Sequence, residues 1–387
     1  MFSPMAQGTV RVWSERAFFL GLSSLFGLDA LPYHLSAMAT MIASVVLLRS
    51  ILARLGGSEA LGVLAPLLWI ANNAVAPAMT WASGYNQILC SFALLLCFRL
   101  RLAGRPVAEA AVLAMSFGAL ETAIVYPAIA LAYELPRGRK RAASTIPLWA
   151  LSAAFAVAHF AAAALPESGP YRLYWGSAPA TFWTYWKMAL GPSRLGLLGI
   201  PASAARSWLA AAFTVALVGY AIRAIRLKQG NAIVFVAWFL ATLAPVLPLR
   251  DHVIDAYLTV PAIGLASLAA IAAVDAWRSG PFARIAAASL VAAYFAVSLP
   301  VGRVLAADIR DRSLRLRADL DTIAAATRGR AVGALYLKGA SPEFAGAALA
   351  HRPMVLSGLP EPVLLDSGAT VKDPGAIVVD LSGGRAK

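Results

Sequence analysis

A few polar and ionisable residues interrupt an otherwise apolar chain, and they are the residues whose types could support chemistry. They form five groups: Glu15 with Arg16; His34; Trp81 with Tyr85 and Asn86; Glu121; and Arg250, Asp251 and His252 followed by Tyr257. A carboxylate can accept a proton from a hydroxyl group, and a cation can stabilise a departing phosphate. Ionisable groups at membrane depth persist where they are paired, hydrated or used. The groups therefore mark a candidate site.

The aromatic members and the histidine also have ordinary structural interpretations. Trp81, Tyr85 and Tyr257 are typical of the aromatic belt at a membrane surface, together with the aromatic residues between 171 and 186. His34 is equally typical of a hydrogen-bonding residue near a helix end. The sequence leaves both interpretations open beside the functional one.

The charged members differ in how readily a structural role explains them. Arg250 has three structural alternatives: pairing with Asp251, pairing with Asp255, or contact with lipid headgroups. Glu121 lies in the nearly uncharged stretch between Arg105 and Arg137. Burial of a carboxylate there costs several kcal/mol unless a cation or water reaches it. We therefore expect Glu121 to have either a partner or a function.

Composition places these groups in a membrane protein. Of 387 residues, 60% are hydrophobic and 13% charged, and the mean hydropathy is +0.71, whereas soluble domains carry about 25% charged residues. The net charge is +14, but the positive residues form no patch on a soluble domain, so nucleic acid is excluded as a partner. Cys90 and Cys97 lie in one apolar run and are interpreted as small packing residues.

The hydropathy pattern predicts an all-α polytopic bundle with about eight full spans and a helical hairpin. The hairpin, near 106–118 and 121–135, turns close to Glu121. The predicted spans lie near 33–55, 60–78, 85–102, 146–165, 205–226, 232–248, 257–277 and 284–301. Residues 1–32 are then an N-terminal segment outside the membrane, 33–304 the bundle, and 305–387 a small C-terminal α/β domain. Its strands are expected at Val332–Leu337 and Ala376–Leu381.

The distribution of positive charge predicts an orientation. Alternate connections hold fourteen Lys and Arg residues on one side and five on the other, and the richer side is expected to be cytoplasmic. All five polar groups and the C-terminal domain then lie outside. An external start leaves two alternatives: the N-terminus is translocated without a preceding span, or an upstream helix is missing from this chain. Ala17–Leu28 is expected to be a helix in the membrane interface.

Several motifs resemble, in order and spacing, the membrane core of the C-type (GT-C) glycosyltransferases over residues 11–275. The closest likeness is to bacterial proteins similar to protein O-mannosyltransferases and to tetratricopeptide-linked mannosyltransferases. The motifs are Phe26-Gly27-Leu28-Asp29, Tyr33-His34-Leu35, Trp81-Ala82-Ser83-Gly84-Tyr85-Asn86, Glu121-Thr122-Ala123-Ile124-Val125-Tyr126-Pro127, and Pro248-Leu249-Arg250-Asp251-His252 before Tyr257-Leu258 and Pro261.

The resemblance implies transfer of a sugar, such as a hexose or mannose, from a polyprenyl-phosphate donor on the non-cytoplasmic face. The acceptor would be a saccharide, a lipid or a protein, and the enzyme would be integral to the bacterial inner membrane with a periplasmic C-terminal domain. The family's first span and its acidic motif would lie upstream of Arg11, and Glu15 is the nearest acid here. Before Trp81 and beside Glu121 the chain carries Asn72, Asn73, Pro77 and Leu120 instead of the family's frequent residues.

By position, the resemblance implies roles for individual residues. Arg250 would hold the lipid phosphate with help from His252, and Asp251, Glu121 and Glu15, in descending order, would serve the acceptor or act as base. The predicted substrate-binding residues are Arg250, His252, Arg16, His34, Trp81, Tyr85, Asn86 and Tyr257. The sequence predicts no metal-ligand set, and the need for a divalent metal stays open.

Two other functions compete with glycosyl transfer. The first is a catalytically inactive protein of the same fold that binds a lipid-linked saccharide or a partner enzyme. The second is a transporter, which would be expected to show inverted repeats and broken helices at mid-membrane. The polar groups here gather at one face instead.

Overall fold

The computed structural model describes residues 10–27, 29–56, 58–162, 169–341, 344–345, 359–365 and 375–382. The chain forms two compact units, Met1–Ala306 and Ala307–Lys387. The described part of the first unit is helical, and its last helix continues into the second.

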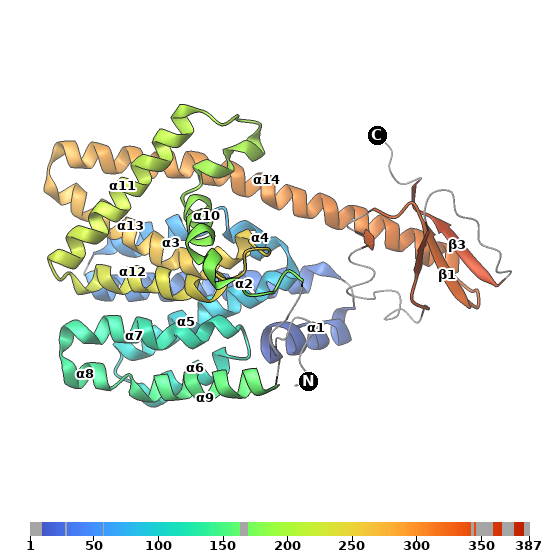
Figure 1. Ribbon diagram of the computed structural model, residues 1–387, viewed down its shortest axis with the longest axis horizontal. Helices are drawn as coiled ribbons and strands as arrows, with labels where there is room; N and C mark the ends of the chain where they lie inside the picture. The colour runs from blue at the N-terminus through green and yellow to red at the C-terminus, as the bar shows by residue number, and fades with distance from the viewer. Residues whose placement is uncertain are drawn as a thin grey trace. The chain divides into compact units, whose positions relative to one another are not determined.

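The first unit is a bundle of helices joined by short turns (Figure 1). Its helices are η1 (Val12–Ala17, a π-helix), α1 (Phe18–Phe26), α2 (Ala30–Gly56), α3 (Glu59–Ile70), α4 (Val75–Thr80), α5 (Tyr85–Leu102), α6 (Pro106–Ser116), α7 (Tyr126–Glu134), α8 (Arg139–Ala143), α9 (Ile146–Ala162), α10 (Ala178–Leu190), α11 (Ala204–Arg226), α12 (Gly230–Leu243), α13 (Thr259–Ser279) and α14 (Pro281–Thr327). Short 3₁₀ turns are η2 (Ala82–Gly84), η3 (Glu121–Val125), η4 (Leu135–Arg137), η5 (Trp175–Ser177), η6 (Pro192–Leu198), η7 (Ala244–Val246) and η8 (Asp255–Leu258).

Within the described residues, 6 helices are long and apolar enough to cross a membrane: Ala30–Gly56, Ala82–Leu102, Arg139–Ala162, Ala204–Arg226, Pro261–Ser279 and Pro281–Thr327. Large apolar side chains face outward on them, with Val215 72% exposed and Phe282 85% exposed. Exposure of such an apolar surface to water is unfavourable, whereas lipid tails solvate it. The protein is therefore a helical membrane protein.

Two of the eight predicted spans are shorter helices in the structure. The span predicted at 60–78 is divided into α3 and α4, because the Asn72 side chain accepts a hydrogen bond from the Ala74 N–H and closes a turn between them. The span predicted at 232–248 is helical as Gly230–Leu243 and then becomes 3₁₀ at Ala244–Val246, where Pro245 has no N–H to donate to the carbonyl oxygen four residues earlier.

The predicted hairpin is present as α6 and α7, and a buried ionic network holds it to α5. The Arg101 side chain is 5% exposed. Its Nε lies 2.7 Å from Glu109 Oε1, and its Nη1 lies 3.1 Å from Glu134 Oε1. The Tyr126 hydroxyl donates to the same Glu109 oxygen at 2.6 Å. Three helices thus share one buried ionic network, in which Glu134 Oε2 has no hydrogen-bond partner.

Two buried tryptophans join α3 and α12 to the start of α13. The Trp69 indole N–H donates to the Thr259 carbonyl oxygen at 2.9 Å, and the Trp238 indole N–H donates to the Val260 carbonyl oxygen at 3.0 Å. These bonds use carbonyls at the start of α13, and both indoles are fully buried. Cys90 and Cys97 are also buried and form no disulfide.

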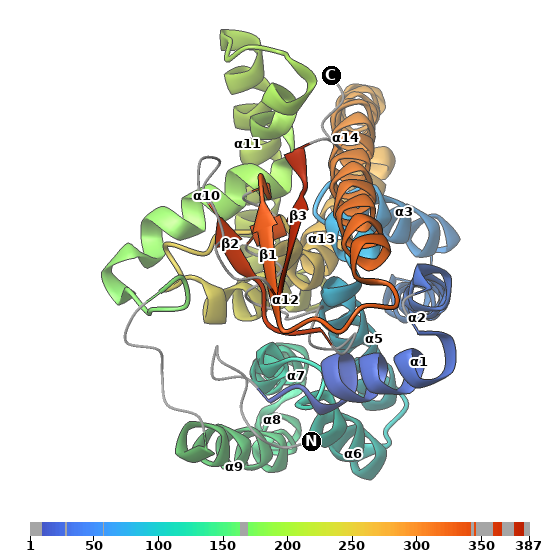
Figure 2. The same cartoon turned by 90° about the vertical axis from the view of Figure 1, so that its right-hand side faces the viewer.

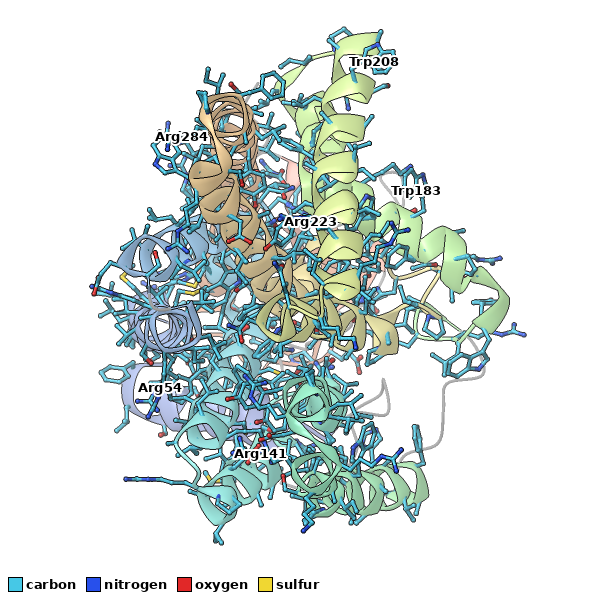
Figure 3. All side chains as sticks on the ribbon, turned by 90° about the vertical axis from the view of Figure 1, so that its left-hand side faces the viewer. Arg54, Arg141, Trp183, Trp208, Arg223 and Arg284 are labelled. Atoms are coloured by element: carbon cyan, nitrogen blue, oxygen red, sulfur yellow. The ribbon has the colours of Figure 1, made fainter. Side chains whose placement is uncertain are left out.

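The two ends of the first unit differ in charge. In Figure 1 the connections α2–α3, α5–α6, α7–α9, α11–α12 and α13–α14 lie at the left, and these carry most of the Lys and Arg residues. Figure 3 faces this arginine-rich end, with Arg54, Arg141, Arg223 and Arg284 spread across it. The connections α1–α2, α3–α5, α6–α7 and α12–α13 lie at the opposite end, where all five polar groups fall.

The second unit combines the end of α14 with a small parallel sheet (Figure 2). Its strands are β1 (Ala334–Lys338), β2 (Val363–Leu365) and β3 (Ala376–Asp380), in the order β2-β1-β3. Tyr336 pairs with both Val363 and Val378. Strands therefore occur within both predicted runs.

Candidate functional site

The first polar cluster forms where the N-terminal π-helix meets the hairpin tip. The Trp13 N–H donates to the Gly118 carbonyl oxygen at 2.9 Å, and the Ser14 hydroxyl donates to the Ala119 carbonyl oxygen. These two bonds fix η1 against the turn between α6 and η3. Glu121 opens η3 immediately after that turn.

Arg11 lies between two carboxylates in this cluster. Its Nη1 is 2.6 Å from Glu15 Oε1 and its Nε is 3.1 Å from Glu121 Oε2. The Asn86 side-chain amide donates to Glu15 Oε1 at 3.4 Å. The side chains of Arg11, Glu15 and Glu121 are 13%, 15% and 21% exposed, respectively. The partner expected for Glu121 is therefore a guanidinium from a residue 110 positions earlier.

Gly118 makes this docking sterically feasible. A Cβ atom at position 118 would lie 2.5 Å from Trp13 Cδ1, well inside van der Waals contact. The Trp13 ring therefore needs a glycine beneath it, and any larger residue would push η1 away from the hairpin.

Tyr85 and Asn86, which follow Trp81 in the predicted site, lie beside this cluster. The turn that precedes them, η2, positions them there. A Cβ atom at Gly84 would meet the Ala78 backbone at 2.8 Å, so the glycine permits the close approach of α4 to η2. The Tyr85 ring stacks on Phe18 at 4.0 Å between centroids. Asn86 faces Glu15, whereas the side chain of Trp81 is 49% exposed.

Arg16 and His34 lie near the same end. Arg16 follows Glu15 on η1, and His34 is half-buried near the start of α2. Its neighbour Tyr33 is buried and donates its hydroxyl proton to the Gly27 carbonyl oxygen at 3.0 Å. Tyr33 therefore ties α2 to the preceding turn.

A second cluster surrounds the Arg250 loop, between η7 and η8. Arg250 Nε lies 3.1 Å from Asp251 Oδ1, and the guanidinium lies 4.3 Å from the Tyr174 ring centroid. The Tyr174 N–H donates to the Pro248 carbonyl oxygen at 2.8 Å, which holds the two loops together. With 58% of its side chain exposed, Arg250 keeps access to an external anion.

His252 is enclosed by tyrosines in the same loop. Its ring centroid lies 4.5 Å from Tyr171 and 5.7 Å from Tyr257. Burial lowers the pKa of His252 below its ordinary value of 6.5. The imidazole is therefore neutral at pH 7, where it can donate or accept one hydrogen bond but supplies no positive charge.

Asp255 belongs to a different ion pair. Arg194 on η6 binds Asp255 Oδ1 through both Nε and Nη2. Asp251 and Asp255 were both possible partners for Arg250. In the structure, Arg250 pairs with Asp251, and Arg194 pairs with Asp255. The Arg194 contact anchors the segment after α10 to the start of η8.

Tyr257 belongs to the second cluster, beside His252. Burial raises the pKa of its phenol. Three segments that are remote in sequence, near residues 11–15, 121 and 250–257, lie at the same end of the bundle.

The arrangement offers proton acceptors and accessible cations. Glu15, Glu121 and Asp251 are carboxylates, and Arg250 is an exposed guanidinium. Exposed Arg172 lies 5.1 Å from the centroid of the same Tyr174 ring. Among the residues the structure describes, no three His, Cys, Asp or Glu side chains gather into a metal-binding group.

Sequence reasoning missed Arg11 and Arg194. The i, i+4 spacing of Arg11 and Glu15 is a signal that could have identified the first, since such pairs face each other on a helix. No local pattern identifies Arg194, which pairs with a residue 61 positions away.

Comparison of the chain with protein-family models, with curated proteins and with solved structures finds no match. A functional assignment therefore depends on the geometry of these two clusters.

Proposed function

We propose that the protein is an integral membrane glycosyltransferase of the GT-C type. It transfers a sugar from a polyprenyl-phosphate donor to an acceptor hydroxyl on the non-cytoplasmic face. The observation that carries the proposal is that Glu15, Glu121 and the Arg250 loop all lie at the end opposite the arginine-rich connections.

The proposed reaction needs a base and an anion-binding group. The acceptor oxygen forms a bond to the anomeric carbon, the bond from that carbon to the phosphate oxygen breaks, and the hydroxyl proton passes to a carboxylate. The leaving group is the polyprenyl phosphate. Arg250, exposed beside Tyr174, suits the developing phosphate charge, and neutral His252 contributes a hydrogen bond.

Asp251, Glu121 and Glu15 are the base or acceptor-binding candidates in that order. Asp251 adjoins the phosphate-binding arginine and is 43% exposed. Glu121 and Glu15 rank below Asp251 because both are already paired with Arg11.

The test is sugar transfer by the purified full chain in lipid nanodiscs, with radiolabelled polyprenyl-phosphate hexoses and a panel of hydroxyl acceptors. Arg250→Ala is expected to reduce transfer by about 10²-fold. Arg49→Ala is the matched control, because Arg49 is 59% exposed and forms one ion pair with Glu59 at the other end. Unchanged transfer by Arg250→Ala would refute the assignment.

The second candidate is a non-catalytic protein that binds the lipid-linked saccharide. The specific observation in its favour is that Arg11 already occupies both Glu15 and Glu121. In that case the unsubstituted protein would retain the donor in the same nanodiscs without turnover, and Arg250→Ala would weaken retention.

A further inference from the structure

A polar cavity of about 510 Å³ lies at the arginine-rich end, far along the bundle from the clusters described above. It opens where the ends of α2, α11, α12 and α13 meet η4. The polar residues in its wall are Ser58, Arg137, Tyr220, Gln229, Asn231, Asp275 and Arg278. At this level of a bundle the lipid headgroups are the neighbouring chemistry.

The charges in the wall favour an anion. Arg137 is held in place by its Tyr133 neighbour, with the guanidinium 3.6 Å from the ring centroid. For Arg278, exposed at the end of α13, the described residues provide no ion pair. Asp275 accepts a hydrogen bond from the Tyr220 hydroxyl at 2.6 Å. Two guanidiniums and one carboxylate leave one positive charge, which matches the single negative charge of a phosphodiester.

An apolar cavity of about 410 Å³ adjoins the polar one. It lies between α11, α13 and α14, and Tyr220 is part of both walls. Neighbouring residues of α13 line the two cavities: Val274 and Arg278 line the polar cavity, and Ala273 and Ala276 line the apolar cavity. The small alanine side chains of α13 and α14 create this space.

The apolar cavity runs along the helices toward the membrane interior. Its wall on α13 extends from Leu265 to Ala276, a rise of about 16 Å at about 1.5 Å per residue. Apart from Asn72, Tyr220 and Tyr294, the lining is apolar and fits a hydrocarbon chain.

We propose that the two cavities together bind one phospholipid. Its phosphodiester lies between Arg137 and Arg278, and one acyl chain lies against the alanines of α13 and α14. Tyr220, hydrogen-bonded to Asp275, stands between headgroup and chain. A basic pocket between helix ends beside a hydrocarbon-lined space is the arrangement that lipid headgroup binding requires. The site is independent of the proposed glycosyl transfer.

The experiment measures phosphatidylglycerol binding to the delipidated full chain by native mass spectrometry in detergent. Arg137→Gln combined with Arg278→Gln is expected to weaken binding by about tenfold or more, since two charge-assisted contacts are lost. Arg139→Gln combined with Arg141→Gln removes the same charge from the same end, outside the cavity wall, and is expected to bind like the unsubstituted chain. Equal binding by both double variants would overturn the proposal.

A second variant separates a lipid from a soluble phosphate. Ala273→Phe fills the apolar cavity and is expected to weaken phosphatidylglycerol binding while leaving binding of glycerol phosphate unchanged. If Ala273→Phe binds phosphatidylglycerol like the unsubstituted chain, the acyl chain is not in this cavity and the lipid proposal is wrong. A thermal melt of each variant verifies that it is folded.

Discussion

Arg11 is the residue on which the first cluster depends, because one guanidinium compensates two carboxylates. Glu15 and Glu121 each retain only about a fifth or less of their side-chain exposure. Without the cation, two like charges would remain close together in a partly desolvated site. Removing one partner from such a group costs more than the pair contributes, because the remaining charges stay buried.

Arg11→Gln is therefore expected to lower the free energy of unfolding by about 3 kcal/mol. Thermal or denaturant unfolding of the purified protein in detergent measures this. Arg49→Gln is the control, because the Arg49–Glu59 pair is exposed and contributes little. Adding Glu121→Gln to Arg11→Gln should recover part of the loss. Equal effects of Arg11→Gln and Arg49→Gln would contradict the prediction.

His252 predicts a loss of stability in mild acid. Its folded-state pKa lies below the ordinary value of 6.5, so the folded protein binds the proton less readily than the unfolded chain. Well above pH 6.5 both states are neutral and the residue has no effect on stability. As pH falls from there toward the folded pKa, the unfolded state gains protons first and stability decreases.

The measurement compares melting temperatures at about pH 7.5 and about pH 5.5. The unsubstituted protein should lose more stability between these conditions than His252→Phe, which keeps an aromatic ring between Tyr171 and Tyr257 but does not titrate. Because other groups titrate equally in both proteins, the difference isolates His252. An identical loss in both would show that the ring is not shielded from protonation.

At the scale of elements, η1 is positioned by a glycine on another segment. Because the Trp13 ring occupies the space of a Cβ at Gly118, Gly118→Ala is expected to displace η1 and separate Arg11 from Glu121. Gly219→Ala, in α11, is the matched control, since a Cβ there meets no atom within 4 Å. Helix propensity alone would make that control slightly stabilising.

Cleavage of the N-terminal segment by a protease reports the displacement. Gly118→Ala should expose the peptide bonds around Arg11 and Arg16 to trypsin, whereas Gly219→Ala should leave them protected. Equal cleavage rates in the two variants would show that the position of η1 does not depend on Gly118, and would contradict the prediction.

At the scale of the whole molecule, the prediction concerns orientation. The concentration of positive charge at one end predicts that this end faces the cytoplasm. Arg139 lies at the arginine-rich end, at the start of α8. Gly176 lies in η5, where an added Cβ atom would have no atom within 4 Å. A membrane-impermeant maleimide applied to intact spheroplasts should label Gly176→Cys and leave Arg139→Cys unlabelled until the cells are permeabilised.

The native cysteines give little background in that experiment, because Cys90 and Cys97 are buried. The reverse labelling pattern would place Glu121 and Arg250 toward the cell interior. That pattern would also contradict the proposal that sugar transfer occurs on the non-cytoplasmic face.

The sequence predicted those features that follow from local pattern. Apolar length indicated where helices lie, and the interruption near Glu121 indicated a hairpin tip, because both are properties of contiguous residues. The break at Asn72 was not predicted, since it depends on one side chain closing a turn and reaching Ala189 on α10. Arg11–Glu121 and Arg194–Asp255 join residues that only the folded chain brings together.

Arg101 has a consequence for the order of events during biogenesis. Glu109 and Glu134, its partners in the folded chain, are synthesised after α5. On the predicted orientation, the unpaired guanidinium is therefore expected to help retain this end of α5 in the cytoplasm while the helix inserts. The same arginine would then hold α6 and α7 against α5 once both are present.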